Sequence, residues 1–169
     1  FCLDRGGLVG EDGATHHGVY DLAYLRAIPN ITICSPMNEE ELRNMMFTAQ
    51  LEGMGPFAIR YPRGRGVMPQ WKTAFNALLV GKGRTIREGK DVAIISIGPI
   101  GNTVLEACLK LAENGISAAA YDIRFLKPID NELLHSIFKF FDKIITVEDG
   151  SILGGLGSAV AEFASDNNY

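Results

Sequence analysis

The densest group of polar side chains lies in the glycine-rich segment 4–18, which holds two adjacent histidines and several acidic residues. Asp12 and His16 are four residues apart, so a coiled segment would bring them together. A carboxylate that orients an imidazole supports proton transfer near neutral pH. A solvated surface turn without chemistry is the alternative, and the segment's composition supports it about equally.

A second polar group follows an apolar run and places Arg60, Arg63 and Arg65 within six residues. Guanidinium forks match the oxygens of phosphate, so the segment predicts a local anion site. In the alternative, Arg60 pairs with an acid at a sheet edge and the other two arginines are solvated. The whole chain has 16 basic and 20 acidic residues, a net charge of −4, which argues against nucleic acid as a partner.

Other chemistries have weaker support. Five side chains are plausible metal ligands, but their spacing matches no established metal motif, and no GxSxG sequence is present to carry a hydrolase nucleophile. Those five are Glu11, Asp12, His16, His17 and Asp21. The glycines at 154, 155 and 157 precede an expected helix, yet the third glycine of a dinucleotide motif is missing and Glu148 and Asp149 come before them. We interpret these glycines as sites of close helix–strand packing.

The elements that position these groups alternate between strand and helix. In the second half, apolar runs predict strands at 92–97, 116–121 and 144–147, with helices after each. Thr103 with Glu106 reads as a capping box, Gly115 as the glycine that ends that helix, and Asp130 as the next N-cap. This alternation predicts parallel strands with helices on both faces of the sheet.

The first half repeats this order more briefly. Strands are predicted at 31–34 and 57–60, and a helix at 19–28. Asn38 is an expected N-cap, followed by three glutamates where the helix dipole favours carboxylates. Residues 64–77 show no periodicity and read as a linker. The predicted fold class is therefore α/β, with two three-layer α/β/α units and mainly parallel sheets.

Composition bounds the class of protein. Hydrophobic residues make up 47% of the 169 residues, enough to form a core, and no apolar stretch approaches the length of a membrane span. The three cysteines form no CxxC pair, and Cys34 and Cys108 lie in apolar runs, so we expect buried thiols rather than disulfides. The abrupt ends of the sequence suggest a piece of a longer chain.

Four motifs together resemble one family. Segment 4–18 reads DRGGLVGEDGATHHG and resembles the DRAG-x-VG-x-DG-x-THxG signature of 1-deoxy-D-xylulose-5-phosphate synthases. Segments 59–64 (IRYPRG), 124–130 (RFLKPID) and 147–150 (VEDG) match that family in the same order. Gly6 stands where the family usually has alanine. Transketolases share only part of the first motif.

The resemblance implies a transferase that uses thiamine diphosphate and Mg²⁺. Such an enzyme decarboxylates pyruvate and adds the two-carbon unit to glyceraldehyde 3-phosphate. The product, 1-deoxy-D-xylulose 5-phosphate, feeds isoprenoid, thiamine and pyridoxal biosynthesis. Residues 1–75 would then be the end of a transketolase-like pyrimidine-binding domain, and 76–169 a transketolase C-terminal domain, truncated at its end.

The resemblance also assigns roles to single residues. Arg5 and Arg63 would bind the phosphate of the acceptor, and Asp12 and His16 would contact substrate oxygens as catalytic residues. No role follows for His17, and Arg60 is expected in a structural ion pair. The family's residues for the cofactor would precede residue 1, so we expect neither thiamine diphosphate nor Mg²⁺ to bind this chain, and we expect it to be inactive alone.

The resemblance implies, finally, a homodimer in the bacterial cytoplasm, or in a plastid if the source is eukaryotic, with no nucleic-acid or membrane partner. A transketolase or a 2-oxo-acid dehydrogenase β subunit is the nearest alternative. A non-catalytic assembly module is an alternative of a different kind, and a metal-dependent hydrolase is a third.

Overall fold

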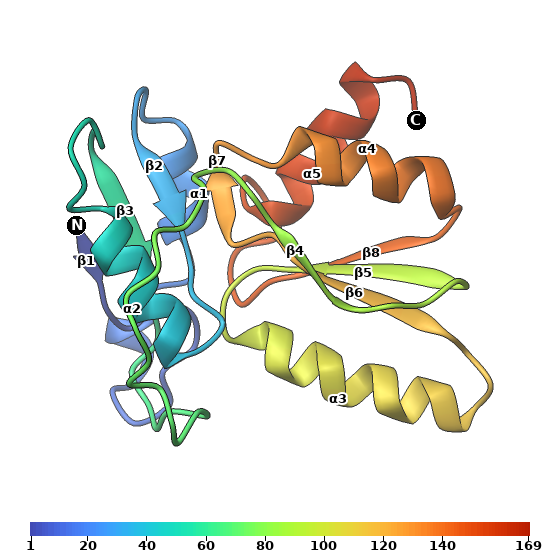
Figure 1. The fold of residues 1–169 in the computed structure, drawn as a ribbon, viewed down its shortest axis with the longest axis horizontal. Helices are drawn as coiled ribbons and strands as arrows, with labels where there is room; N and C mark the ends of the chain where they lie inside the picture. The colour runs from blue at the N-terminus through green and yellow to red at the C-terminus, as the bar shows by residue number, and fades with distance from the viewer.

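The computed structural model describes residues 1–169 and arranges them in two four-stranded sheets (Figure 1). The first sheet has the order β1 (Cys2–Leu3), β3 (Phe57–Arg60), β2 (Thr32–Cys34) and β7 (Phe125–Lys127). Its first three strands are parallel, whereas β7 pairs antiparallel with β2. A strand from the second half of the chain therefore completes the sheet of the first half.

The second sheet has the order β4 (Arg84–Arg87), β6 (Ala118–Asp122), β5 (Val92–Ser96) and β8 (Ile144–Val147). β5 is parallel to both of its neighbours, and β4 is an antiparallel edge strand. The central strands β5 and β6 are buried along their whole length, as continuous apolar runs predict.

Helices cover both faces of each sheet. In the first unit, Ile33 faces the core that contains α1 (Asp21–Arg26), and its neighbour Cys34 faces α2 (Glu39–Thr48). In the second unit, α3 (Ile100–Glu113) packs on one face, and α4 (Asn131–Phe140) and α5 (Leu156–Asp166) on the other (Figure 1). The predicted α/β fold with mainly parallel sheets is confirmed.

Local sequence signals predicted the starts of α2 and α4 and the end of α3. Asn38 Oδ1 accepts the N–H of Glu41 at 3.0 Å, and Asp130 Oδ1 accepts that of Leu133 at 3.1 Å, so both predicted caps are confirmed. Gly115 follows the end of α3 with φ of 78°. The capping box at Thr103 is wrong, because α3 already begins at Ile100.

The cause of that error lies in the turn before the helix. Gly98 has φ of 77°, and an added Cβ at Gly101 would lie 3.1 Å from Ser96 Oγ. The turn thus reverses the chain directly onto the sheet and starts α3 earlier than the capping pattern suggests. Strands β4 and β7 were not predicted either, because neither holds more than two apolar residues.

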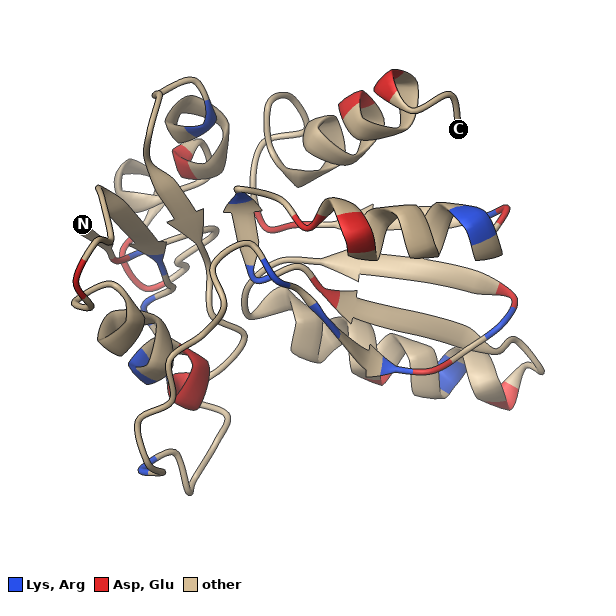
Figure 2. Ribbon diagram, turned by 45° about the horizontal axis from the view of Figure 1, so that its top comes forward, with Lys and Arg blue, Asp and Glu red and all other residues tan.

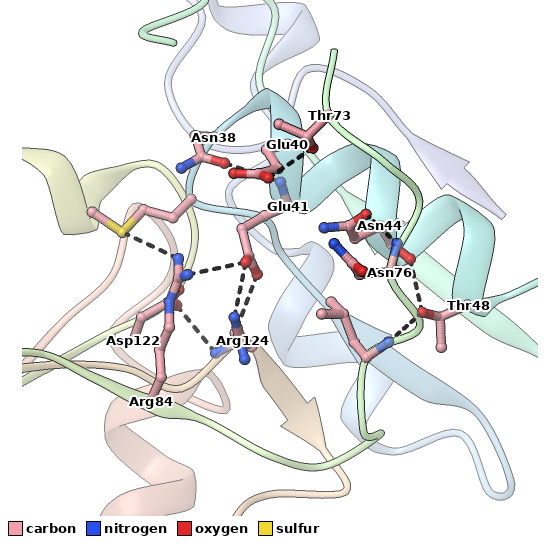
Figure 3. Close-up of polar contacts among 12 residues, drawn as sticks. Asn38, Glu40, Glu41, Asn44, Thr48, Thr73, Asn76, Arg84, Asp122 and Arg124 are labelled. Carbon is pink, nitrogen blue, oxygen red and sulfur yellow. Dashed lines mark hydrogen bonds and ion pairs between the residues drawn. The ribbon is translucent and has the colours of Figure 1, made fainter. Parts of the chain in front are cut away.

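The two units share one core and an ionic network. The largest hydrophobic cluster includes Leu22 of α1, Ile95 of β5 and Leu134 of α4. Next to it, Glu41 of α2 contacts Arg84 and Arg124, and Arg84 also pairs with Asp122 (Figure 3). Glu41 and Asp122 are both buried. Charged groups from both halves of the chain therefore neutralise each other where the units meet.

The remaining surface carries mixed charge. Basic and acidic segments occur on both parts of the ribbon (Figure 2). None of the helices is long and apolar enough to cross a membrane.

Cys34 and Cys108 are buried free thiols, as predicted, and Cys2 is an exposed one. Burial raises the pKa of the Cys108 thiol.

Candidate active-site loop

The loop formed by residues 4–18 follows β1 and closes on itself at its base. The N–H of Gly7 donates to the carbonyl of Gly18 at 3.0 Å, and the N–H of Gly18 donates to the carbonyl of Arg5 at 2.9 Å. Arg5 has φ of 59°, in the left-handed region that costs a non-glycine residue free energy. These two hydrogen bonds fix the backbone that carries the Arg5 side chain.

Two residues from other elements hold the loop from beneath. Arg60, at the end of β3, donates from Nη2 to the carbonyls of Gly18 at 2.8 Å and Asp149 at 2.5 Å. Its Nε lies 3.7 Å from Asp21 Oδ2, which confirms the expected structural ion pair. Burial lowers the pKa of Arg60, and the negative charges of Asp21 and Asp149 oppose that shift. Asp149 Oδ2 accepts the N–H of Leu8 at 3.1 Å.

Glycines allow this close approach. An added Cβ at Gly6 would lie 2.7 Å from Arg60 Cγ, and one at Gly7 would overlap the carboxylate of Asp149. Gly7 also has φ of 81°. The motif around Asp149 therefore positions the loop from the second half of the chain, a role that sequence reasoning had not assigned to it.

The carboxylate of Asp12 lies between the side chains of Arg5 and Arg63. Arg5 Nε donates to Asp12 Oδ2 at 2.9 Å, and Arg63 Nη1 donates to Asp12 Oδ1. The Asp12 side chain is 11% exposed, against 34% for Arg5 and 50% for Arg63. Two guanidinium groups that are 58 positions apart in the sequence thus converge on one anionic group.

The two histidines of the loop face different partners. His16 ends the short helix η1 (Ala14–His16), is exposed, and shares a hydrogen bond of 3.0 Å between its Nδ1 and Thr15 Oγ1. The predicted contact between His16 and Asp12 is not formed, because Asp12 is engaged by the arginines. His17 Nδ1 accepts the N–H of Val9 at 3.0 Å, so this ring braces the loop internally.

The structure separates the three arginines at the end of β3 and beyond it, and an anion-binding role for this segment stays a prediction. Arg60 is 3% exposed because it ends a strand that is buried throughout. Arg63 reaches Asp12 on the loop. Arg65 lines a separate hollow together with Tyr61 and Leu42 of α2. Of these three arginines, only Arg63 forms an ion pair with a side chain of the loop 4–18.

The other candidate sites have structural explanations. Glu148 Oε1 accepts the N–H of Gly157 at 3.0 Å, and an added Cβ at Gly155 would overlap its carboxylate. Glu148 therefore accepts a hydrogen bond from the first turn of α5. The interpretation of these glycines as sites of close packing is confirmed. No group of three or more His, Cys, Asp and Glu side chains comes together in a way that could hold a metal ion.

Comparison with known families agrees with this architecture. A family model of the transketolase pyrimidine-binding domain matches residues 1–67, and a model of the transketolase C-terminal domain matches residues 81–169. The chain belongs to the transketolase family. The boundary between the two domains near residue 75 stays a prediction. β7, which belongs to the second half of the chain, lies in the first sheet.

Within that family, two similar curated relatives carry the same name. A 1-deoxy-D-xylulose-5-phosphate synthase of Cytophaga hutchinsonii is 62% identical over 170 residues, which cover 100% of this chain and 27% of the relative. The synthase of Bacteroides thetaiotaomicron is 60% identical over 99% of this chain and 26% of the relative. The resemblance to this group of synthases is confirmed, and the chain spans about a quarter of the length of these relatives.

A solved structure shows the same fold. It is described as a split gene transketolase, inactive beta4 tetramer, and is 34% identical with a TM-score of 0.86. The match covers 99% of this chain and 54% of that one.

Proposed function

We propose that this chain is the C-terminal part of a thiamine-diphosphate-dependent synthase that condenses pyruvate and glyceraldehyde 3-phosphate to 1-deoxy-D-xylulose 5-phosphate. Residues 1–75 would complete a pyrimidine-binding domain, and 76–169 would form the C-terminal domain. The names of the relatives support the activity, and the active-site loop supports a specific contribution of this chain to it.

Arg5 and Arg63 bind the phosphate of the acceptor in this proposal. The observation that carries it is their convergence on the Asp12 carboxylate. Two groups that bind one carboxylate from two sides are suited to a phosphate dianion, which offers more acceptor oxygens and more charge. A phosphate held in this way fixes the position of the aldehyde at the other end of a three-carbon acceptor.

His16 donates a proton to the oxygen of the acceptor aldehyde as that carbon forms its new bond. The ring is exposed on the loop that carries Arg5, and its Nε2 forms no hydrogen bond within the chain. An imidazole titrates near neutral pH and is suited to this transfer. Asp12 contacts a hydroxyl of the substrate beside the phosphate.

Thiamine diphosphate would supply the carbon nucleophile in the complete enzyme, together with Mg²⁺. The carboxylates, thiols and imidazoles of this chain form no group of three or more that could hold a metal ion. Both groups would be held by the part of the enzyme that this chain lacks, and the isolated chain would be inactive.

Self-association of the isolated chain is part of the same proposal. β1 lies at the edge of the first sheet, and Phe1 beside it is 77% exposed. An uncovered sheet edge favours pairing with a second copy. The similar split gene transketolase chain is itself described as an inactive tetramer.

A hybrid enzyme tests the proposed activity. In this hybrid synthase, the 170 matching residues of the Cytophaga hutchinsonii synthase are replaced by the present chain. We expect it to release CO2 from pyruvate and form the five-carbon phosphate when glyceraldehyde 3-phosphate is added. A folded hybrid that accepts a ketose phosphate but not pyruvate as donor would contradict the proposal, and so would synthase activity of the isolated chain.

A further inference from the structure

We propose that Asp12 is an internal counter-ion of the phosphate site, which competes with the acceptor's phosphate for Arg5 and Arg63. This inference rests on the proposed function, because it assumes that these arginines bind phosphate. It adds that one residue of the loop limits the affinity of the site and makes phosphate binding an exchange of anions.

The geometry uses both oxygens of the carboxylate. Asp12 Oδ2 takes Nε of Arg5, and Oδ1 takes Nη1 of Arg63. Each oxygen thus serves a different guanidinium, as two oxygens of one phosphate would. The carboxylate is the least exposed member of the three, so it lies between the arginines rather than at their outer side.

The charges make the two anions competitors. Arg5 and Arg63 carry two positive charges. Asp12 pairs with both of them, and the more exposed Asp4 also pairs with Arg5. A phosphate dianion that accepts hydrogen bonds from the same N–H groups either displaces the carboxylate or lies beside it at close range, where like charges repel. Both arrangements weaken phosphate binding relative to a site without Asp12.

The loop gives Asp12 room to move. Gly10 and Gly13 lie on either side of it, and an added Cβ at either position would have no atom within 4 Å. The N–H of Asp12 donates to the carbonyl of Val9 at 3.1 Å, so the exchange needs a change of the Asp12 side-chain rotamer, for which the open space beside these glycines leaves room. The carboxylate can therefore leave the arginines while the base of the loop stays fixed by Gly7 and Gly18.

Such an exchange has a use in the proposed reaction, since the product carries the same phosphate group as the acceptor. A site that held phosphate as tightly as two unopposed arginines would also retain the product. When Asp12 returns to Arg5 and Arg63, it replaces the hydrogen bonds that the departing phosphate gives up. The counter-ion thus lowers the cost of product release.

Inorganic phosphate is the probe that tests this role. In the hybrid synthase, we expect Asp12→Asn to tighten phosphate binding on the order of tenfold, because one charge-assisted competitor is lost. Titration calorimetry measures the affinity without turnover, and competitive inhibition against glyceraldehyde 3-phosphate provides a second value. Glu11→Gln removes the same charge from the same exposed loop without touching either arginine, and should change the affinity less than twofold.

The outcomes separate this inference from the proposed function. If Arg63→Ala leaves phosphate binding unchanged, the arginines do not bind phosphate and the proposed function fails. If Arg63→Ala weakens binding while Asp12→Asn leaves it unchanged or weakens it, only the counter-ion role is refuted. Asp12→Ala is a second variant in case Asp12→Asn misfolds. Thermal melting identifies the variants that fold as the parent does. At least one of these folded variants must bind phosphate more tightly than the parent.

Discussion

The guanidinium of Arg124 donates two hydrogen bonds to the carboxylate of Glu41, from Nε at 2.9 Å and from Nη2 at 2.8 Å. Glu41 belongs to α2 in the first unit, and Arg124 precedes β7, which runs from the second unit into the first sheet. Arg124 has φ of 55°, a left-handed conformation that aims its side chain at Glu41. This pair therefore ties the crossing strand to the helix that it passes (Figure 3).

Loss of this pair should destabilise the junction of the two units. Arg124→Ala removes one partner of a buried carboxylate and leaves Glu41 with Arg84 alone, so we expect a loss of about 2–3 kcal/mol in the free energy of unfolding. Urea denaturation measures this change. Glu132→Ala is the matched control, because it removes a solvent-exposed partner of Lys82, and it should have little measurable effect. Equal losses for the two variants would contradict the role of the pair.

Asp122 should make stability depend on pH. It is 1% exposed, and burial raises its pKa from the ordinary 3.8 to about 6, although Arg84 and Arg124 oppose the shift and Glu41 adds to it. The folded state thus binds the proton more tightly than the unfolded state between about pH 4 and 6. The contribution of Asp122 to stability is therefore fully present below this window and is lost as the pH rises through it.

The comparison of wild type with Asp122→Asn isolates that effect, since other carboxylates titrate alike in both. We expect the stability of the wild type relative to the variant to fall by about 2–3 kcal/mol between pH 4 and pH 6.5, from a pKa difference of about two units. Denaturation curves at several pH values give this difference. A constant difference across the range would show that Asp122 titrates normally.

Two of the three N-cap sites of the sequence analysis, Asp130 and Thr103, should respond in opposite directions. Asp130→Ala removes the cap of α4 and the acceptor for the N–H of Gly83, so a loss of about 2 kcal/mol is expected. Thr103 lies exposed inside α3, and Thr103→Ala should gain about 0.5 kcal/mol through helix propensity. Thermal unfolding measures both changes. A loss at Thr103 comparable to that at Asp130 would restore the capping interpretation.

Arg63 should matter only for phosphorylated acceptors. In the hybrid synthase, Arg63→Ala should raise KM for glyceraldehyde 3-phosphate on the order of tenfold to a hundredfold, because a charge-assisted contact is lost. KM for unphosphorylated glyceraldehyde should stay near that of the parent. Arg65→Ala is the control, since Arg65 faces another hollow. A similar rise in KM for both acceptors would place Arg63 outside the phosphate site.

The candidate site was only partly predictable from the residues. Asp12 and Arg63 were selected by residue type and spacing, and the family motifs added Arg5; the structure brings the three side chains together. The spacing of four between Asp12 and His16 suggested a contact that the structure lacks. Gly13 lies between them with φ of 77°, so the segment does not coil as a helix would.

The supports of the loop were less visible in the sequence. Asp149 is distant from Leu8 along the chain, and nothing in the residue types signals that its carboxylate binds the loop backbone. Arg60 was expected in an ion pair, but its hydrogen bonds to two backbone carbonyls depend on where β3 and the loop meet.

By itself, the sequence determined the local elements and the α/β class, because apolar runs, capping side chains such as Asn38 and Asp130, and glycines such as Gly115 act over a few residues. Only the tertiary structure decided that β7 crosses into the first sheet, that Glu41 meets Arg124, and that Asp12 serves two arginines. These contacts join residues far apart in the chain, and their stability comes from burial and charge neutralisation, which exist only once the units have packed together.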